Sequence, residues 1–180
     1  MPGKIIVIMS CMFSGKTETL ISYSRKYLVA KKKIVVVKYL ADTRYSDTEV
    51  RSHNQNAIKA NFSCNSLGII VGNPNVREAD VVLIDEGQFF PDLTIVAEQL
   101  AQNGKIVVVS CLSGNYKREP FPEVSALLSK AEEIIHLTAV CSRCGEPASF
   151  TKKIIPGSEL ILIGGSESYQ ARCRSCFELE

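Results

Sequence analysis

The sequence lacks an apolar run of membrane-spanning length, and it carries almost no net charge. No apolar stretch approaches the ~20 residues that a membrane-spanning helix needs. The 21 lysines and arginines stand against 19 acidic residues, and a net charge of +2 is too small to indicate nucleic-acid or membrane binding. Internal repeats, low-complexity segments and a leader with a cleavage site are also missing. We therefore expect a cytoplasmic protein with no nucleic-acid or membrane partner.

Composition and length are typical of a globular protein with a small extra region. Hydrophobic residues make up 46% and charged residues 22% of the 180 residues, which excludes a disordered tail or a collagen-like fibre. At about 150 residues per domain, the length predicts one domain plus a small appendage. A chain of this size can bury enough apolar surface to fold without disulfides.

The N-terminal part predicts a strand, a loop, a helix and a second strand. Residues 5–9 form an apolar run, and Leu20, Tyr23 and Tyr27 then recur at helical spacing. A second apolar run covers residues 34–37. Such a βαβ unit is expected to have parallel strands, so the sequence predicts an α/β fold.

The rest of the chain divides near residue 138. Residues 41–75 are polar and weakly periodic, so we expect much of this stretch to be a mobile, functional loop. Apolar runs and amphipathic segments predict further strands and helices, at 81–84, 91–103, 106–109, 123–130, 134–137, 150–155 and 160–163. The texture changes from Cys141 onwards, and we expect one domain over 1–138 and a smaller one over 139–180.

A phosphate-binding loop is predicted directly after the first strand. It matches the end of the pattern G-x-x-x-x-G-K-[ST], with serine at the first glycine position, over Ser10, Cys11, Met12, Phe13, Ser14, Gly15, Lys16 and Thr17. Lys16 would bridge the β- and γ-phosphates of a nucleotide, and the Thr17 hydroxyl would bind Mg²⁺. The alternative is a chance Gly-Lys-Thr tripeptide. Its place between a buried strand and an amphipathic helix favours the nucleotide interpretation.

Asp85 and Glu86 follow the apolar run at 81–84. Ligands of open α/β sheets bind at the carboxyl ends of the strands, where this pair is expected to lie. Beside a phosphate loop, Asp85 would support Mg²⁺ and Glu86 would accept a proton from the attacking nucleophile. Taken alone, the pair could equally be the solvated start of a loop.

The seven cysteines include two CxxC pairs, and residues 145–172 separate the pairs. The four thiolates of Cys141, Cys144, Cys173 and Cys176 predict a closed tetrahedral Zn²⁺ site of structural type. A redox role for CxxC pairs is the alternative, but no thioredoxin-like context surrounds them. The three lone cysteines Cys11, Cys64 and Cys111 fit packing roles, although Cys11, within the phosphate loop, is also a candidate reactive thiol.

Several segments in this order resemble the zinc-containing thymidine kinases of animals, many bacteria and large DNA viruses. They are Met-Phe-Ser-Gly-Lys-Thr at 12–17, Lys-Tyr at 38–39, Asp-Thr-Arg-Tyr-Ser at 42–46, Asp-Glu-Gly-Gln-Phe-Phe-Pro-Asp at 85–92, Leu-Thr-Ala-Val-Cys at 137–141 and Ile-Gly-Gly at 163–165. The similarity covers nearly the whole chain. Ser113 departs from it, because aspartate is usual after Leu112.

The resemblance implies a RecA-like ATP-binding domain and a small C-terminal zinc-bearing "lasso" domain. It further implies that the γ-phosphate of ATP is transferred to the 5′-hydroxyl of thymidine or deoxyuridine, giving dTMP in nucleotide salvage. It also implies Mg²⁺ and structural Zn²⁺ as cofactors, inhibition by thymidine triphosphate (dTTP) and a homotetramer.

The resemblance also assigns site residues. Glu86 matches the general base, and Asp42, Arg44 and Gln88 join the phosphate loop and Asp85 around ATP and Mg²⁺. Residues matching the nucleoside pocket are Met12, Phe89, Leu112, Tyr116, Phe121 and Tyr169, together with the lasso residues Leu160, Ile161, Leu162, Ile163 and Gly164. From the residues alone, Phe89 and Phe90 could instead belong to the core.

Two other functions compete with this one. A phosphate-loop ATPase with water as nucleophile would hydrolyse ATP without regard to nucleosides. A zinc-ribbon nucleic-acid-binding protein is disfavoured, because the zinc region lacks a basic stripe.

Overall fold

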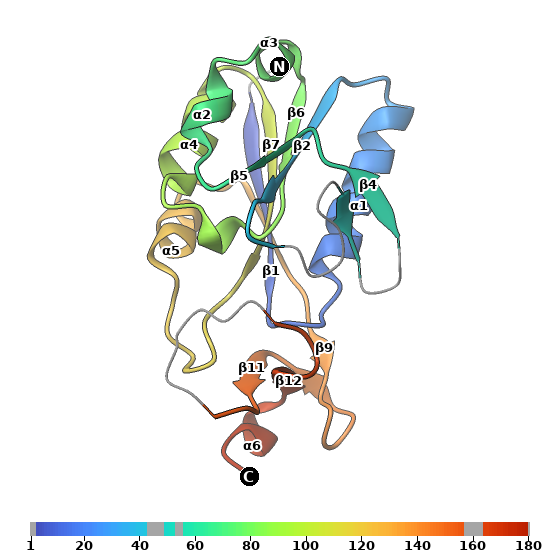
Figure 1. Cartoon of the computed structure of the whole chain (residues 1–180), viewed down its shortest axis with the longest axis vertical. Helices are drawn as coiled ribbons and strands as arrows, with labels where there is room; N and C mark the ends of the chain where they lie inside the picture. Colours follow the sequence, from blue (N-terminus) through green and yellow to red (C-terminus); the bar gives the residue numbers. More distant parts are fainter. Residues whose placement is uncertain (1–2, 43–48, 53–55, 157–163, 180) are drawn as a thin grey trace.

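The computed structural model describes residues 3–42, 49–52, 56–156 and 164–179 (Figure 1). The chain forms a large α/β layer with a small cysteine-bearing module at one end of its sheet. The elements in chain order are β1 (Lys4–Ser10), α1 (Lys16–Val29), β2 (Ile34–Tyr39), β3 (Glu49–Arg51), β4 (Ala57–Lys59), β5 (Phe62–Cys64), α2 (Gly68–Val71), α3 (Pro74–Glu78), β6 (Val81–Ile84), the 3₁₀ turn η1 (Gly87–Phe89), α4 (Leu93–Gln102), β7 (Ile106–Leu112), α5 (Pro122–Leu128), β8 (Glu133–His136), β9 (Ala139–Val140), β10 (Pro147–Ala148), β11 (Phe150–Lys153), β12 (Tyr169–Arg172) and α6 (Arg174–Phe177).

The central sheet has six strands in the order β5-β2-β6-β7-β1-β8, and every neighbouring pair is parallel. Its four inner strands, β2, β6, β7 and β1, carry buried apolar residues on both faces, as a sheet covered on both sides requires. In β1, Ile5 and Val7 face the core shared with α2 to α5, while Ile6 and Ile8 face the core under α1. The predicted α/β fold with a parallel central sheet is confirmed.

The polar stretch at 41–75 is more structured than the sequence predicts, so the mobile-loop prediction is wrong for its described part. β5 extends the central sheet beside β2, and β3 pairs with β4 in an antiparallel hairpin. Widely spaced apolar residues explain the difference, because Cys64, Leu67 and Ile70 are all buried in the core. Residues 43–48 and 53–55 lie outside the described part.

Helix α4 begins two residues after Pro91, which we expected in its first turn. The intervening Asp92 is engaged elsewhere. Its carboxylate accepts hydrogen bonds from the Ser66 hydroxyl at 2.6 Å and from the Leu67 and Gly68 amides at 3.0 and 2.7 Å. Asp92 thereby joins the start of α2 to the start of α4.

The C-terminal module consists of two small antiparallel pairs, β9 with β10 and β11 with β12, followed by α6. Of the two strands predicted here, the one at 150–155 is present as β11, and the one at 160–163 lies outside the described residues. The partner of β11 is instead β12. No helix in the described part of the chain has the length and apolar character to cross a membrane.

Candidate active site and metal centre

The predicted phosphate loop connects β1 to α1 at the carboxyl edge of the sheet. Gly15 precedes α1 with a φ of 83°, a left-handed conformation that glycine adopts without strain. Within the loop, the Ser14 hydroxyl and the Lys16 ammonium both donate to the carbonyl of Cys11, at 2.9 and 2.6 Å. Two hydrogen bonds to the same carbonyl, one of them from Lys16, therefore close the loop.

Lys16 is partly buried, in a position that favours an anionic ligand. Burial lowers its pKa, and the nearby Glu86 carboxylate opposes that change. A buried ammonium is stabilised by negative charge placed against it. Phosphate oxygens would supply that charge and would replace the Cys11 carbonyl as the acceptor for the Lys16 ammonium.

Ser10 occupies the place of the first motif glycine without backbone strain. It is the last residue of β1 and is fully buried, and it is absent from the positions with positive φ. Its hydroxyl donates to the carbonyl of Leu137 at 2.6 Å. The serine therefore joins the end of β1 to the segment that leads into the C-terminal module.

The structure brings the acidic pair to the phosphate loop. Asp85 Oδ1 accepts hydrogen bonds from the Thr17 hydroxyl at 3.4 Å and from the hydroxyl of Ser110, the latter at close range. Thr17 lies in the first turn of α1, Asp85 follows β6, and Ser110 lies in β7. Two hydroxyl groups from different elements thus fix one carboxylate at the end of the sheet.

Glu86 and Gln88 form a second polar group beside the first. Glu86 has a left-handed backbone conformation, with a φ of 54°, and this turns the chain into η1. The Gln88 amide nitrogen donates to Glu86 Oε2, and its oxygen accepts from the Leu112 amide at 3.0 Å. Gly87 allows η1 to approach β7, because a Cβ there would lie 2.5 Å from Cγ1 of Val109.

The residues predicted for the nucleoside pocket differ in their burial and in the groups that they contact. The Phe89 ring packs at a tilt against the Tyr39 ring, with 5.2 Å between the ring centroids. Phe90 is fully buried in the core. Phe121 is partly buried against the same core, and Tyr169 is buried in β12. The ring of Tyr116 lies under the ammonium groups of Lys117 and Lys153.

The remaining predicted site residues lie beside the segments outside the described part, or within them. Asp42 follows β2 at the same edge of the sheet, and its amide donates to the Tyr39 carbonyl at 3.1 Å. Gly164 is buried. Arg44 and the lasso residues Leu160, Ile161, Leu162 and Ile163 lie outside the described residues, so the complete pocket stays a prediction.

The phosphate loop is joined to the C-terminal module. The Met12 amide donates to the Thr151 hydroxyl at 3.0 Å, and the Cys11 thiol donates to the Ala148 carbonyl at 3.4 Å. Burial raises the pKa of the Cys11 thiol, and this disfavours the reactive thiolate. Cys11 is therefore a packing residue between the two regions.

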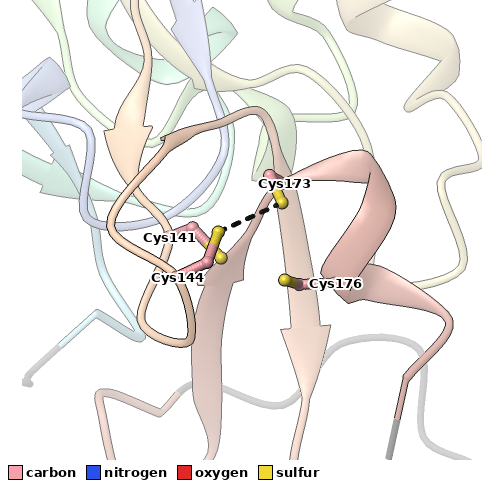
Figure 2. Close-up of side chains that lie close together, drawn as sticks. All are labelled: Cys141, Cys144, Cys173 and Cys176. Carbon is pink, nitrogen blue, oxygen red and sulfur yellow. Dashed lines mark hydrogen bonds between the residues drawn. The ribbon is translucent and has the colours of Figure 1, made fainter.

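Four cysteines from two segments converge in the C-terminal module (Figure 2). Cys141 and Cys144 follow β9, Cys173 precedes α6, and Cys176 lies within α6. Their sulfur atoms all lie within 4.8 Å of one another, with 3.6 Å between Cys144 and Cys173. Four sulfurs at ~2.3 Å from one Zn²⁺ would be about 3.8 Å apart. The cluster therefore fits a closed tetrahedral zinc site.

A separate cavity of about 500 Å³ lies between the segment after β7 and the C-terminal module. Among the described residues that line it, none is a predicted site residue. Its lining consists of Ser113, Gly114, Asn115, Arg118, His136, Pro147, Ser149, Phe150, Thr151 and Arg174.

The sequence matches a known protein family over nearly its whole length. The family model described as thymidine kinase matches residues 3–177. The chain belongs to the thymidine kinase family. The resemblance drawn from its motifs is confirmed.

Individual thymidine kinases match over nearly the whole chain. The thymidine kinase of raccoon poxvirus is 41% identical over 175 residues, covering 97% of both chains. Thymidine kinase 1 of Dictyostelium discoideum is 42% identical over 179 residues, covering 97% of this chain and 78% of its own. The thymidine kinase of Yaba monkey tumor virus is 43% identical, covering 97% and 94%.

A solved structure shares the fold at much lower identity. It is the flagellar accessory protein FlaH from Methanocaldococcus jannaschii, with a TM-score of 0.53 and 13% sequence identity. The similarity covers 88% of this chain and 75% of that chain. At this identity the match supports the α/β fold alone.

Two polar residues that contact the candidate site were not predicted from the sequence. Ser110 bonds Asp85, and Thr151 bonds the Met12 amide. The position of Ser110 near the end of the apolar run at 106–109 was a usable signal, because parallel strands end at the same edge. Thr151 had no comparable signal, since only the packing of the C-terminal module brings it to the phosphate loop.

Proposed function

We propose that this chain transfers the γ-phosphate of ATP to the 5′-hydroxyl of thymidine, and of deoxyuridine, and so supplies dTMP in nucleotide salvage. Family membership supports thymidine phosphorylation as the reaction. The observation that carries the proposal is the grouping of Lys16, Thr17, Asp85 and Glu86 at one edge of the sheet. It combines a phosphate cradle with a carboxylate that can accept a proton.

In this proposal, ATP binds with its phosphates in the loop at 10–17. Lys16 neutralises charge on the β- and γ-phosphates, as the burial of its ammonium group among acceptors supports. The amino end of α1 adds its partial positive charge to the same place. Asp42 and Arg44 are proposed to contribute from the segment after β2.

Thr17 and Asp85 are proposed to hold Mg²⁺. A hydroxyl oxygen and a carboxylate oxygen are the hard ligands that this ion prefers, and they lie 3.4 Å apart. When bound, Mg²⁺ neutralises charge on the transferred phosphate. Ser110 would keep the Asp85 carboxylate oriented through its hydroxyl hydrogen bond.

Glu86 is proposed to accept the proton from the nucleoside 5′-hydroxyl as its oxygen attacks the γ-phosphorus. The ADP oxygen leaves from the opposite side. A fixed carboxylate near the phosphate-binding lysine suits this role, since the base must lie close to both substrates.

The thymine base is proposed to bind the backbone of residues 160–169, which a base with its own donors and acceptors can pair with. Met12 and Leu112 would form apolar walls for the methyl group. Phe89, Tyr116, Phe121 and Tyr169 are proposed to complete the pocket around the nucleoside.

The further parts of the proposal are a structural Zn²⁺ on the four cysteines, inhibition by dTTP, a homotetramer and a cytoplasmic location. The division into domains at 1–138 and 139–180 belongs to it as well. The packing of the sulfur cluster against Cys11 supports the view that Zn²⁺ acts by holding the C-terminal module in place.

One assay separates the proposed kinase from both rival functions. ADP release from ATP is measured alone, with thymidine and with single-stranded DNA, using the Glu86→Gln variant as the control. The kinase releases ADP only with thymidine, and the variant loses that response. Nucleoside-independent hydrolysis would support an ATPase, and stimulation by DNA would support a nucleic-acid-dependent enzyme.

A further inference from the structure

Gln88 connects two parts of the proposed site through one side chain. It lies in η1, and 7% of its surface is exposed. Its amide oxygen accepts from the Leu112 backbone N–H at 3.0 Å, and its amide nitrogen donates to Glu86 Oε2 at 2.5 Å. Both hydrogen-bonding atoms of the amide are therefore engaged within the protein.

The topology of the sheet explains why Gln88 reaches Leu112. Strand β6 ends at Ile84, opposite Val109, whereas β7 continues to Leu112. The last residues of β7 thus have no β6 partner on that side. The side chain of Gln88 takes the place of the missing strand for the Leu112 amide.

The chemistry of these groups fixes the direction of the amide. A backbone N–H can only donate, so the amide oxygen of Gln88 must face Leu112. The NH₂ group is then turned towards Glu86, where it meets an oxygen that must accept. One oxygen of the proposed base is thereby held in place by a donated hydrogen bond.

We propose that Gln88 is a positioning residue for Glu86, a role that rests on the proposed function. It holds one carboxylate oxygen of the base at a fixed place. The same amide ties the base to Leu112, a predicted wall of the nucleoside pocket. This assignment differs from the direct contact with ATP and Mg²⁺ that family resemblance implies for Gln88.

Two substitutions separate the contacts of Gln88. Gln88→Glu keeps the length of the side chain and an acceptor for the Leu112 amide but replaces the donor to Glu86 with a second carboxylate, which repels the first. Gln88→Met keeps a similar volume and removes both bonds. For Gln88→Glu, we expect kcat for thymidine to fall about 10- to 100-fold, within the range of a lost charge-assisted hydrogen bond. The KM for ATP and the Mg²⁺ concentration at half-maximal rate should change by less than about threefold.

A double-mutant cycle tests whether Gln88 acts through Glu86. In a Glu86→Gln background, Gln88→Met should lower kcat by less than about threefold, because the base is already gone. If the kcat losses of the two single variants multiply in the double variant, the assignment is overturned in favour of a metal contact. A raised Mg²⁺ requirement in the single variants at Gln88 would overturn it in the same way. If thermal melting shows that Gln88→Met does not fold, Gln88→Glu decides the question, because it is expected to lower kcat and to leave KM nearly unchanged.

A wild-type chain without thymidine-dependent turnover would overturn the proposed function itself. With an active wild type, unchanged kcat in Gln88→Glu would overturn the role of Gln88 alone.

Discussion

The close approach of η1 to β7 makes Gly87 a sensitive position. In Gly87→Ala, the added Cβ would lie 2.5 Å from Cγ1 of Val109 and 3.4 Å from Cδ2 of Leu93. Gly87 is absent from the glycines with positive φ, so the conflict is steric rather than conformational. Because Val109 is fully buried in the middle of the sheet, η1 is the part that must move.

Gly87→Ala is expected to lower both stability and the rate of catalysis. Overpacking of this kind destabilises a protein by about 1–3 kcal/mol. For a chain of this size, each 1 kcal/mol lowers the melting temperature by about 2–4 °C. Glu86 and Gln88 flank the substituted residue, and a displacement of about 1 Å in a reacting group can lower the rate about 100-fold. We therefore expect kcat to fall by that order while the protein stays folded.

Thermal melting and steady-state kinetics with thymidine test this expectation, with two controls. Gly72→Ala is the matched substitution, because a Cβ there meets nothing within 4 Å and the backbone is helical. It should leave both stability and kcat near their original values. Val109→Ala removes the clashing atom, so the double variant should lose less than the two single effects combined. If Gly87→Ala matches Gly72→Ala in kcat and melting temperature, η1 does not pack on β7 as described.

Three more predictions concern the proposed reaction and its metal. Glu86→Gln should lose ~10²–10⁴-fold in kcat with little change in nucleoside affinity, and near-normal turnover would remove Glu86 from the mechanism. Metal analysis should find one Zn²⁺ per chain, and Cys173→Ser should destabilise the C-terminal module and abolish activity; a folded, active, metal-free protein would contradict this. Comparison of kcat/KM should rank deoxyuridine at most ~10–200-fold below thymidine and deoxycytidine far lower, because a reversed donor pattern leaves buried groups unpaired. Equal turnover of deoxycytidine would refute backbone recognition of the base.

The large buried strands were predictable because each carries a continuous apolar run. Strands β1, β2, β6 and β7 are all of this kind, and the phosphate-loop motif marks the start of α1. Strand β5 could not be predicted in the same way. It has three residues, and Ser63 is exposed between Phe62 and Cys64, so its membership of the sheet depends on β2.

The residues of the acidic pair were predictable from their place at the end of β6, but their partners were not. The bond from Gln88 to Leu112 joins residues 24 positions apart and depends on where β6 ends relative to β7. Strand β12 was missed for a related reason. It has only four residues, and its pairing with β11 joins residues 16 to 22 positions apart.

The hydrogen bonds from Met12 to Thr151 and from Cys11 to Ala148 also constrain how this enzyme can be recombined. A chimera that takes residues 139–180 from a relative inherits a new surface beneath its phosphate loop. A hydroxyl at position 151 is then needed to satisfy the Met12 amide, and a small residue at position 148 is needed because Ala148 is fully buried beside Cys11. Exchange of the C-terminal segment therefore also replaces two contacts that hold the predicted phosphate loop, and the two parts have to be chosen together.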